Sequence, residues 1–345
     1  MRNPAMNTRG LLTLILAATC ALVFGPTASA ADYFVSTTGS DAANGSQNAP
    51  FRTVIRALNA MDPGDFTYIM PGDYSNGSRL TIEGFHGVEG NLLHLFAFDN
   101  TRKPLFRSGI MIHNTSFVHF KGFDISEIMI QVDGVDTHHN TFENFDVHHV
   151  PDAMGMSLQN SANNNRVINS DFHHNVLFGD SNADGLALWG VSGGTNGPYD
   201  NYVYGCRAYF NNDDGFDTWW SNGENVFENC WSYGNGKDDG FNDILGDGNG
   251  YKLGQGSNNH PRLINCLAWK NKTRGFDENG NQAGGITIYN STGWDNDVRN
   301  FGFFSAPNTD VIKNCVSFAG GGAQTPPEYA TAEYNNWDLG ITADA

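Results

Sequence analysis

Three carboxylates stand within five residues of one another, at Asp213, Asp214 and Asp217, in the stretch NNDDGFDTWW (211–220). Like charges this close repel one another, so the stretch needs water, a counter-charge or a bound cation. The residue types fit three kinds of chemistry: a solvated turn, a pair of catalytic acids, or a cage of oxygen ligands for a metal ion. The choice depends on which other side chains the fold brings to this stretch.

A repeat of about two dozen residues organises the chain from residue 141 onward. Seven segments share an Asn or Gly anchor, at positions 144, 169, 205, 229, 265, 290 and 314. The steps between anchors are 25, 36, 24, 36, 25 and 24 residues, which indicates a basic coil twice lengthened by an insertion. Because helical periodicity is nearly absent, this repeat predicts an all-β solenoid, the stacked coils of a parallel β-helix.

Alignment of the coils predicts columns of like residues. The sixth residue after the anchor forms an asparagine ladder of Asn175, Asn211, Asn235, Asn271 and Asn296. We expect each ladder Asn to take a strained turn conformation and to bond the amide of the next coil. The fourth residue after the anchor forms an aromatic column of His148, His173, Tyr209, Tyr233, Trp269, Trp294 and Phe318. This column favours packing over metal binding for the paired histidines at 138–139, 148–149 and 173–174.

A third column follows the anchor directly and consists of Cys206, Cys230, Cys266, Ser291 and Cys315. Adjacent coils lie roughly 4.8 Å apart, which is within the Cα separation of a disulfide. An exported chain could oxidise such cysteines. We favour stacked free thiols that serve as small core residues.

A further alignment brings the acids together. Pairs of a Gly and an apolar residue recur at 155–156, 185–186, 215–216, 250–251, 275–276 and 302–303. Residues that flank the inward apolar residue should share the outer face of one sheet. Asp184 then neighbours Asp214 on the next coil, and Asp217 lies on the same patch. With Asp213, four carboxylates converge, and Lys252 stands one coil beyond Asp217.

Carboxylate oxygens in that number suit Ca²⁺, which takes six to eight oxygen ligands. The alternative is a plain ion pair between Asp217 and Lys252 beside solvated acids. The register itself has an alternative, because the string DDGF recurs at 238–241 and Gly240 could replace Gly250. We prefer Gly250, since Asp238 has no acidic partner in the following coil.

The N-terminal residues predict an exported protein, and the segments that follow predict its domain organisation. Residues 1–30 have the form of a signal peptide: Arg2 and Arg9, an apolar run at 11–24, and a small-residue cleavage site ending at Ala30. Residues 31–65 predict a strand and a short helix (50–61) that caps the coil stack. Residues 66–320 form the predicted β-helix catalytic domain, and residues 321–345 a tail that covers the other end.

The net negative charge of the chain limits which molecules can bind to it. The chain has 19 basic and 37 acidic residues, and loss of the signal peptide with its two Arg leaves 17 − 37 = −20. Nucleic acid and an anionic membrane are therefore excluded as partners. An acidic polysaccharide would also be repelled unless a bound cation changed the local charge. We expect a secreted monomer.

Four motifs follow one another along the chain: NADGLAL (182–188), NNDDGFDTWW (211–220), GNGYKLGQG (248–256) and NKTRGFDENGN (271–281). They resemble those of polysaccharide lyase family 9, the secreted right-handed parallel β-helix pectate lyases. The resemblance implies that Asp184, Asp213, Asp214 and Asp217 are ligands of a catalytic Ca²⁺. It implies that Lys252 is the base. Leu186 and Leu188-Trp189 depart from the commoner family pattern, and this departure bears on substrate preference.

The implied reaction is β-elimination in a uronate polymer, most simply polygalacturonate, in which a base removes the C5 proton and the C4 oxygen leaves. Calcium would neutralise the carboxylate next to C5. Arg274 is a candidate for binding a substrate carboxylate, with an ion pair to Asp277 or Glu278 as its alternative. Trp219 and Tyr251 are candidates for stacking on sugar rings, unless they pack inward.

Two rival functions use the same acids. An inverting glycoside hydrolase would use Asp184 with Asp213 or Asp214 as acid and base, about 6.5–9.5 Å apart. A calcium-stabilised carbohydrate-binding protein would need the acids alone. Neither rival gives Lys252 a role.

Overall fold

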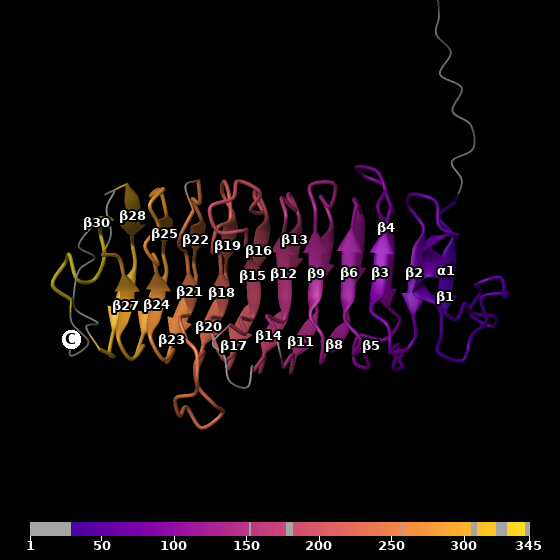
Figure 1. Cartoon of the computed structure of the whole chain (residues 1–345), viewed down its shortest axis with the longest axis horizontal. Helices are drawn as coiled ribbons and strands as arrows, with labels where there is room; N and C mark the ends of the chain where they lie inside the picture. The colour runs from indigo at the N-terminus through magenta and orange to yellow at the C-terminus, as the bar shows by residue number, and fades with distance from the viewer. Residues whose placement is uncertain are drawn as a thin grey trace, which may run out of the picture. The chain divides into compact units, whose positions relative to one another are not determined.

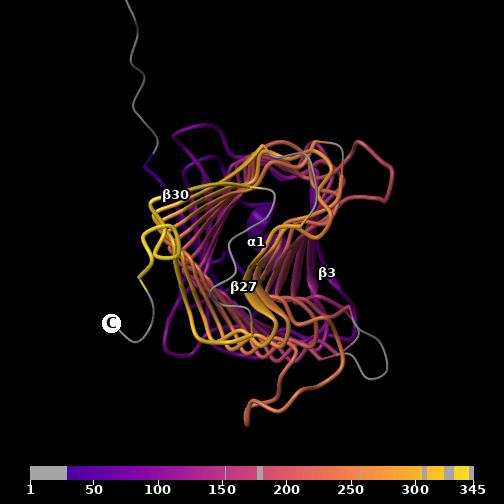
Figure 2. The ribbon, with the colours of Figure 1, turned by 90° about the vertical axis from the view of Figure 1, so that its left-hand side faces the viewer.

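The computed structural model describes residues 29–151, 153–176, 182–256, 258–304, 309–321 and 330–341. Residues 31–345 form one compact unit. The predicted signal peptide lies outside the described residues except for its last two. Within the unit, short parallel strands stack coil upon coil into three sheets (Figures 1 and 2). The all-β solenoid predicted from the repeat is the observed architecture.

The first sheet has twelve strands: β1 (Asp32–Val35), β2 (Phe66–Ile69), β4 (Leu93–Ala97), β7 (Val118–Lys121), β10 (Thr141–Glu143), β13 (Arg166–Ile168), β16 (Tyr202–Tyr204), β19 (Val226–Glu228), β22 (Arg262–Ile264), β25 (Thr287–Tyr289), β28 (Asp310–Lys313) and β30 (Ala330–Glu333). The second sheet has nine: β5 (Leu105–Phe106), β8 (Asp124–Ser126), β11 (Asp146–His148), β14 (Asp171–His173), β17 (Arg207–Tyr209), β20 (Trp231–Tyr233), β23 (Leu267–Trp269), β26 (Thr292–Trp294) and β29 (Val316–Phe318). The third sheet also has nine: β3 (Leu80–Glu83), β6 (Ile110–His113), β9 (Ile130–Asp133), β12 (Met156–Gln159), β15 (Leu186–Leu188), β18 (Phe216–Asp217), β21 (Tyr251–Lys252), β24 (Arg274–Asp277) and β27 (Arg299–Gly302).

One helix, α1 (Val54–Leu58), lies at the N-terminal end of the stack (Figure 1). Thr53 caps it, since its hydroxyl oxygen accepts a hydrogen bond from the backbone N–H of Arg56 at 3.2 Å. Val54, Ala57 and Leu58 are buried in the common core. The predicted capping helix is therefore present, but it is shorter than the 50–61 span.

The coil register follows the predicted steps. In the first sheet the Cα partners run from coil to coil through Phe142, Val167, Val203, Phe227, Leu263, Ile288 and Ile312. These positions repeat the steps of 25, 36, 24, 36, 25 and 24 residues found for the anchors. The insertion between β20 and β21 leaves the coil as a projecting loop (Figure 1).

The third sheet confirms the Gly250 register, because Phe216 pairs with Tyr251 and Asp217 pairs with Lys252. The inward rings of Phe216, Tyr251, Phe276 and Phe301 stack with centroids 5.1, 5.0 and 4.9 Å apart. The prediction for the last coil is wrong by two residues. Phe276 pairs with Phe301, not Phe303, and Asp277 pairs with Gly302. A shift of two keeps an apolar residue facing inward, so alternation alone could not detect it.

The asparagine ladder is present. The Nδ2 of Asn235, for example, donates to Asn271 Oδ1 at 2.9 Å, and Asn211 Nδ2 donates to Asn235 Oδ1 at 3.0 Å. The predicted strain lies elsewhere: positive φ angles occur at the anchor, such as Asn229 (56°), and at the residue before the ladder, such as Phe210 (53°). The ladder side chain must point into the stack, so its neighbour makes the turn.

A second ladder, which the sequence alignment missed, joins Asn140, Asn165, Asn201 and Asn225 in the same way. The four cysteines of residues 31–345 are free and buried, as predicted. The aromatic column is also present, with His173, Tyr209, Tyr233 and Trp269 stacked at 4.7, 4.8 and 4.0 Å. These four rings are half-buried and lie on the outer face of the second sheet.

At the C-terminal end, β30 continues the first sheet, and Trp337 packs at 5.2 Å from the ring of Phe301. Part of the predicted covering tail, residues 322–329, lies outside the described residues. No helix in the described part of the chain is long and apolar enough to cross a membrane.

Candidate active site

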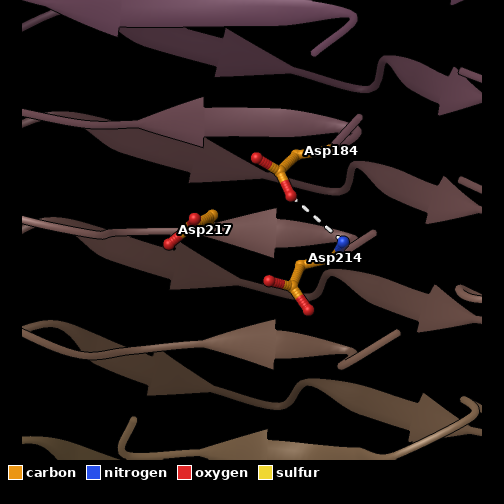
Figure 3. Close-up of side chains that lie close together, drawn as sticks. All are labelled: Asp184, Asp214 and Asp217. Carbon is orange, nitrogen blue, oxygen red and sulfur yellow. Dashed lines mark hydrogen bonds between the residues drawn. The ribbon is translucent and has the colours of Figure 1, made fainter. Parts of the chain in front are cut away.

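Three of the predicted acids meet on the third sheet. Asp184 lies two residues before β15, Asp214 two residues before β18, and Asp217 ends β18. One carboxylate oxygen of each lies within 4.8 Å of the others (Figure 3). All three side chains are buried, with 1%, 0% and 5% of their residue surface exposed. The stacking of coils thus places three acids from two coils in one buried group, as the alignment predicted.

Hydrogen bonds fix one oxygen of each carboxylate. Asp184 Oδ1 accepts from the backbone N–H of Asp214 at 3.0 Å (Figure 3). Asp214 Oδ1 accepts from the backbone N–H and the side-chain amide of Asn249, at 2.7 and 2.9 Å. Asp217 Oδ1 accepts from the backbone N–H of Trp219 at 2.7 Å. By contrast, the buried Asp214 Oδ2 is held by an ion pair with Lys252.

The glycine column explains why these coils can approach so closely. A Cβ at Gly185 would lie 2.6 Å from the carbonyl oxygen of Gly215 in the next coil and 2.9 Å from the ladder amide of Asn211. Any side chain there would push the two coils apart. The Gly between Asp184 and Leu186 therefore keeps Asp184 in register with Asp214.

Lys252 faces the acid group from the following coil. Its Nζ lies 2.9 Å from Asp214 Oδ2 and 3.7 Å from Asp217 Oδ2. Burial would lower the pKa of Lys252, but the negative charges of Asp217 and Asp214 outweigh it and hold the pKa above its usual value. The ion pair considered from the sequence, Asp217 with Lys252, is thus present, although Asp214 is the nearer partner.

The acids themselves are crowded and poorly solvated. Burial, followed by the charges of Asp217 and Asp214, raises the pKa of Asp184 well above its usual value. Burial raises the pKa of Asp217 to about 6, although Lys252 opposes it. One lysine therefore compensates the group incompletely, and a divalent cation would complete the balance. The donor set, three carboxylates whose oxygens lie within 4.8 Å of one another, fits a hard metal ion.

Asp213, the fourth predicted acid, is not in the three-carboxylate group. Its Oδ1 accepts a hydrogen bond of 2.6 Å from the backbone N–H of Asp247, in the loop between β20 and β21. Burial and the charge of Asp214 raise the pKa of Asp213 to about 8. Asp213 is therefore electrostatically coupled to the group while its carboxylate is held by the loop.

A pocket of about 160 Å³ opens onto the acid group. Its lining consists of Met154, Asn182, Asp184, Ala187, Trp189, Asp217, Trp219 and Lys252. Sequence reasoning had placed Asp184, Asp217, Trp219 and Lys252 at the site. It missed Met154 and Asn182, and it noted Trp189 only as a departure from the family motif. Met154 could have been found, because it occupies the same column as Asp184 and Asp214 in the coil alignment.

The three predicted substrate-binding residues differ in position. Trp219 lines the pocket, and its indole N–H donates to Gln255 Oε1 at 3.0 Å. Arg274 forms the ion pair that was its alternative, with Nη1 2.9 Å from Asp277 Oδ2. The prediction for Tyr251 is wrong: its ring is 0% exposed inside the core stack, and its hydroxyl donates to the Cys230 carbonyl. In a two-residue strand, Lys252 faces outward and Tyr251 must face inward.

Comparison with known proteins places this geometry in a family. The model of the Pel9A-like, right-handed β-helix region matches residues 33–325. Pectate lyase L of Dickeya chrysanthemi is 32% identical over 340 residues, which cover 91% of this chain and 76% of the relative. Pectate lyase L of Dickeya dadantii (strain 3937) is 33% identical with the same coverage. A crystal structure of pectate lyase Pel9A superposes with a TM-score of 0.78 at 30% identity, covering 92% of this chain and 82% of that one.

The fold and the comparisons together define a right-handed parallel β-helix of the polysaccharide lyase class. The chain belongs to the Pel9A-like β-helix family, whose relatives in this comparison are pectate lyases. The predicted family, the predicted handedness of the fold and the predicted class of enzyme are confirmed. The roles of the individual site residues are not given by these comparisons.

Proposed function

We propose that the protein is a calcium-dependent lyase that cleaves a uronate-containing polymer, with polygalacturonate as the first candidate, by β-elimination. The observation that carries this proposal is the position of Lys252, 2.9 Å from Asp214 in a pocket lined by Asp184 and Asp217. The names of the relatives, pectate lyases, support the choice of polymer. The predicted signal peptide supports export, and a monomer is the simplest form of such an enzyme.

Lys252 is the proposed Brønsted base. Its side chain is 13% exposed and lines the pocket, so a sugar bound there would meet Nζ directly. To act as a base, Nζ must be neutral when it takes the C5 proton; the electron pair of the C5–H bond then forms the C4=C5 double bond as the C4–O bond breaks, and the departing oxygen takes a proton from water. The carboxylates that raise the pKa of Lys252 favour its charged form, so activity should increase toward alkaline pH.

Asp184, Asp214 and Asp217 are the proposed calcium ligands, with Asp213 as a fourth implied by the family motif. When bound, Ca²⁺ would neutralise these carboxylates and that of the substrate, which makes both the C5 proton and the Lys252 ammonium easier to deprotonate. Asn249 and the backbone of Asp214 orient the protein carboxylates through the hydrogen bonds described above.

An inverting hydrolase is the weaker candidate. Its two carboxyl groups would leave room for a water molecule, about 6.5–9.5 Å apart. Here oxygen atoms of the three acids approach within 4.8 Å of one another. The hydrolase mechanism also has no role for Lys252. A purely carbohydrate-binding protein would likewise give Lys252 no function.

The test is to incubate the protein with polygalacturonate and Ca²⁺ at alkaline pH and to follow the absorbance of unsaturated uronides. We expect activity that a chelator abolishes, that added Ca²⁺ restores, and that Lys252→Ala loses. Lys237→Ala is the matched control, because Lys237 is also buried and ion-paired, 2.6 Å from Asp297, but lies outside the pocket. Reducing sugar without the unsaturated product, or activity indifferent to chelator and to Lys252→Ala, would overturn the proposal.

A further inference from the structure

A second pocket, of about 340 Å³, adjoins the candidate active site on its N-terminal side. The two pockets share Met154 and Trp189. The remaining lining comes from the two preceding coils and from the segment after β15, and includes Met129, Gln131, Gln159 and Asn160. A polymer bound with one unit at Lys252 and extending toward the N-terminal coils would therefore place a neighbouring unit in this second pocket.

Among the residues that the structure describes, no basic side chain lines the second pocket. Two of its amides contact a carboxylate: Gln159 Nε2 and Asn160 Nδ2 both donate to Asp133 Oδ1, at 3.0 and 2.5 Å, and the other oxygen of Asp133 lies 3.2 Å from His113 Nδ1. A carboxylate placed there would lose water, find no lysine or arginine in the lining, and lie close to Asp133. A charged uronate unit therefore fits this pocket poorly.

The C-terminal side of the candidate active site carries two arginines. Arg274 and Arg299 are Cα partners on β24 and β27, and both guanidinium groups lie over the ring of Phe304, at 5.6 and 4.5 Å. Arg274 Nε is buried without a hydrogen-bond partner. The C-terminal side of Lys252 thus carries two guanidinium groups, one of them paired with Asp277, whereas no described lysine or arginine lines the pocket on the N-terminal side.

The second pocket has the groups that bind sugar rings. Trp189 presents a half-buried indole to both pockets, and its buried Nε1 has no hydrogen-bond partner in the described part of the chain. Gln131 points outward from β9 into the pocket, in the same column as Ser157 and Asp217. An aromatic face with amide groups around it is the usual lining for a neutral pyranose, whose hydroxyl groups pair with amides and whose C–H face packs on the ring.

We propose that the second pocket is a subsite for an uncharged pyranose unit next to the uronate that Lys252 attacks. This proposal rests on the lyase function proposed above and names its substrate class: a polymer in which uronates alternate with, or lie beside, uncharged units. The unit is either a neutral sugar or a uronate whose carboxyl is methyl-esterified, since both lack the charge that the pocket disfavours.

The first experiment compares kcat/KM on three polymers: fully de-esterified polygalacturonate, partly methyl-esterified polygalacturonate, and a polymer that alternates uronate with a neutral deoxyhexose. We expect at least one of the two polymers with uncharged units to exceed the de-esterified one by tenfold or more. Which of the two does so identifies the unit. A preference for the de-esterified polymer would overturn the proposal.

Gln131→Arg then tests the pocket itself. Adding a cation there should reduce the preference for uncharged units at least tenfold by improving cleavage of the de-esterified polymer relative to the others. Thr292→Arg is the matched control, because it adds the same charge on β26 of the second sheet, away from both pockets. An unchanged preference in Gln131→Arg, with the fold intact by circular dichroism, would also overturn the proposal.

A binding measurement separates this proposal from the lyase function. Calorimetric titration of Lys252→Ala with short oligomers of the three polymers reports the subsite without turnover. If no unsaturated product forms from any polymer but Gln131→Arg still changes the order of binding, the lyase function fails and the subsite remains. If elimination occurs but neither binding nor turnover responds to Gln131→Arg, the subsite alone fails.

Discussion

Lys252 Nζ lies 2.9 Å from Asp214 Oδ2, and neither side chain is more than 13% exposed. The two residues are 38 positions apart in sequence and meet because β18 and β21 are adjacent strands of the third sheet. A buried ion pair costs desolvation of both groups, so its removal on one side leaves an uncompensated charge. Asp214 thus holds Lys252 in place, and the pair must be loosened before Lys252 can act as a base.

Loss of one acid should weaken calcium binding. We expect Asp184→Asn, Asp217→Asn and Asp213→Asn each to lower the affinity for Ca²⁺ by tenfold or more, because each removes a charged ligand oxygen. Isothermal titration with Ca²⁺ alone measures this without substrate.

Asp171→Asn is the control for these three variants, since Asp171 pairs with Arg207 on the second sheet. Its Ca²⁺ affinity should match that of the unmodified protein. If Asp213→Asn binds Ca²⁺ normally while the other two do not, Asp213 serves to anchor the loop through Asp247 and is not a ligand.

Lys252 should be the group that takes the C5 proton, and an arginine at this position should not replace it. Lys252→Arg keeps the positive charge near Asp214 but supplies a group that is not deprotonated in proteins. We therefore expect near-normal stability with a loss of kcat of about 10²–10⁴. Steady-state rates and thermal unfolding of the same preparation check this. A variant that keeps most of its kcat would show that another group takes the proton.

The asparagine ladder should dominate the stability of the middle coils. Asn235 donates to the Ala208 carbonyl, the Ser232 hydroxyl and Asn271 Oδ1, and accepts from Asn211. Asn235→Ala leaves several buried groups unpaired, so we expect it to lower the free energy of unfolding by about 2–4 kcal/mol. Asn196→Ala, at an exposed position, should change it by less than about 0.5 kcal/mol. Denaturant titration of both variants makes the comparison.

The cysteine column should stay reduced and unreactive in the folded protein. Cys206, Cys230 and Cys266 are fully buried, and each thiol contacts backbone carbonyls. Burial raises the pKa of the Cys230 thiol well above its usual value, which suppresses the reactive thiolate. An aromatic disulfide reagent should therefore titrate none of the four thiols of residues 31–345 in the native protein and all four after unfolding. Fewer than four after unfolding would indicate a disulfide.

The sequence predicted the coil register well because each coil repeats one buried pattern. The register alone brings Asp184, Asp214 and Lys252 together on adjacent coils. The error at the last coil has a physical cause: Phe301 and Phe303 are both apolar and have the same parity, so either satisfies the inward position. The alternation of apolar and polar residues along a strand determines which face of the sheet a residue lies on. It does not distinguish registers that differ by two residues.

Two other features of the site depend on information that a periodic pattern lacks. The Asp213 carboxylate is held by the backbone of Asp247, inside the insertion that makes one coil longer than its neighbours. Trp189 lies just past the end of β15, where the chain leaves the repeat. Residues in such segments have no counterpart in adjacent coils, so their positions could not be read from columns. Tyr251 was different, because the alignment already placed it at an inward position.

Asp310 should make stability depend on pH. It begins β28 with 2% of its surface exposed, and its Oδ1 accepts from the backbone N–H of Ile286 at 2.9 Å. Burial outweighs this hydrogen bond and raises the pKa of Asp310 to about 6. The folded protein thus binds the proton more tightly than the unfolded chain does. The resulting stabilisation is fully present below about pH 4 and is lost as the pH rises through about 6.

Asp310→Asn removes this titration and keeps an acceptor for Ile286. We expect the variant to gain stability relative to the unmodified protein between pH 4 and pH 7, by roughly 2–3 kcal/mol, since each pKa unit corresponds to about 1.4 kcal/mol. Thermal unfolding of both proteins across this range gives the difference curve, in which contributions of the other acids cancel. A difference that stays constant from pH 4 to pH 7 would show that Asp310 is ionised in the folded state throughout, because its hydrogen bonds offset the cost of burial.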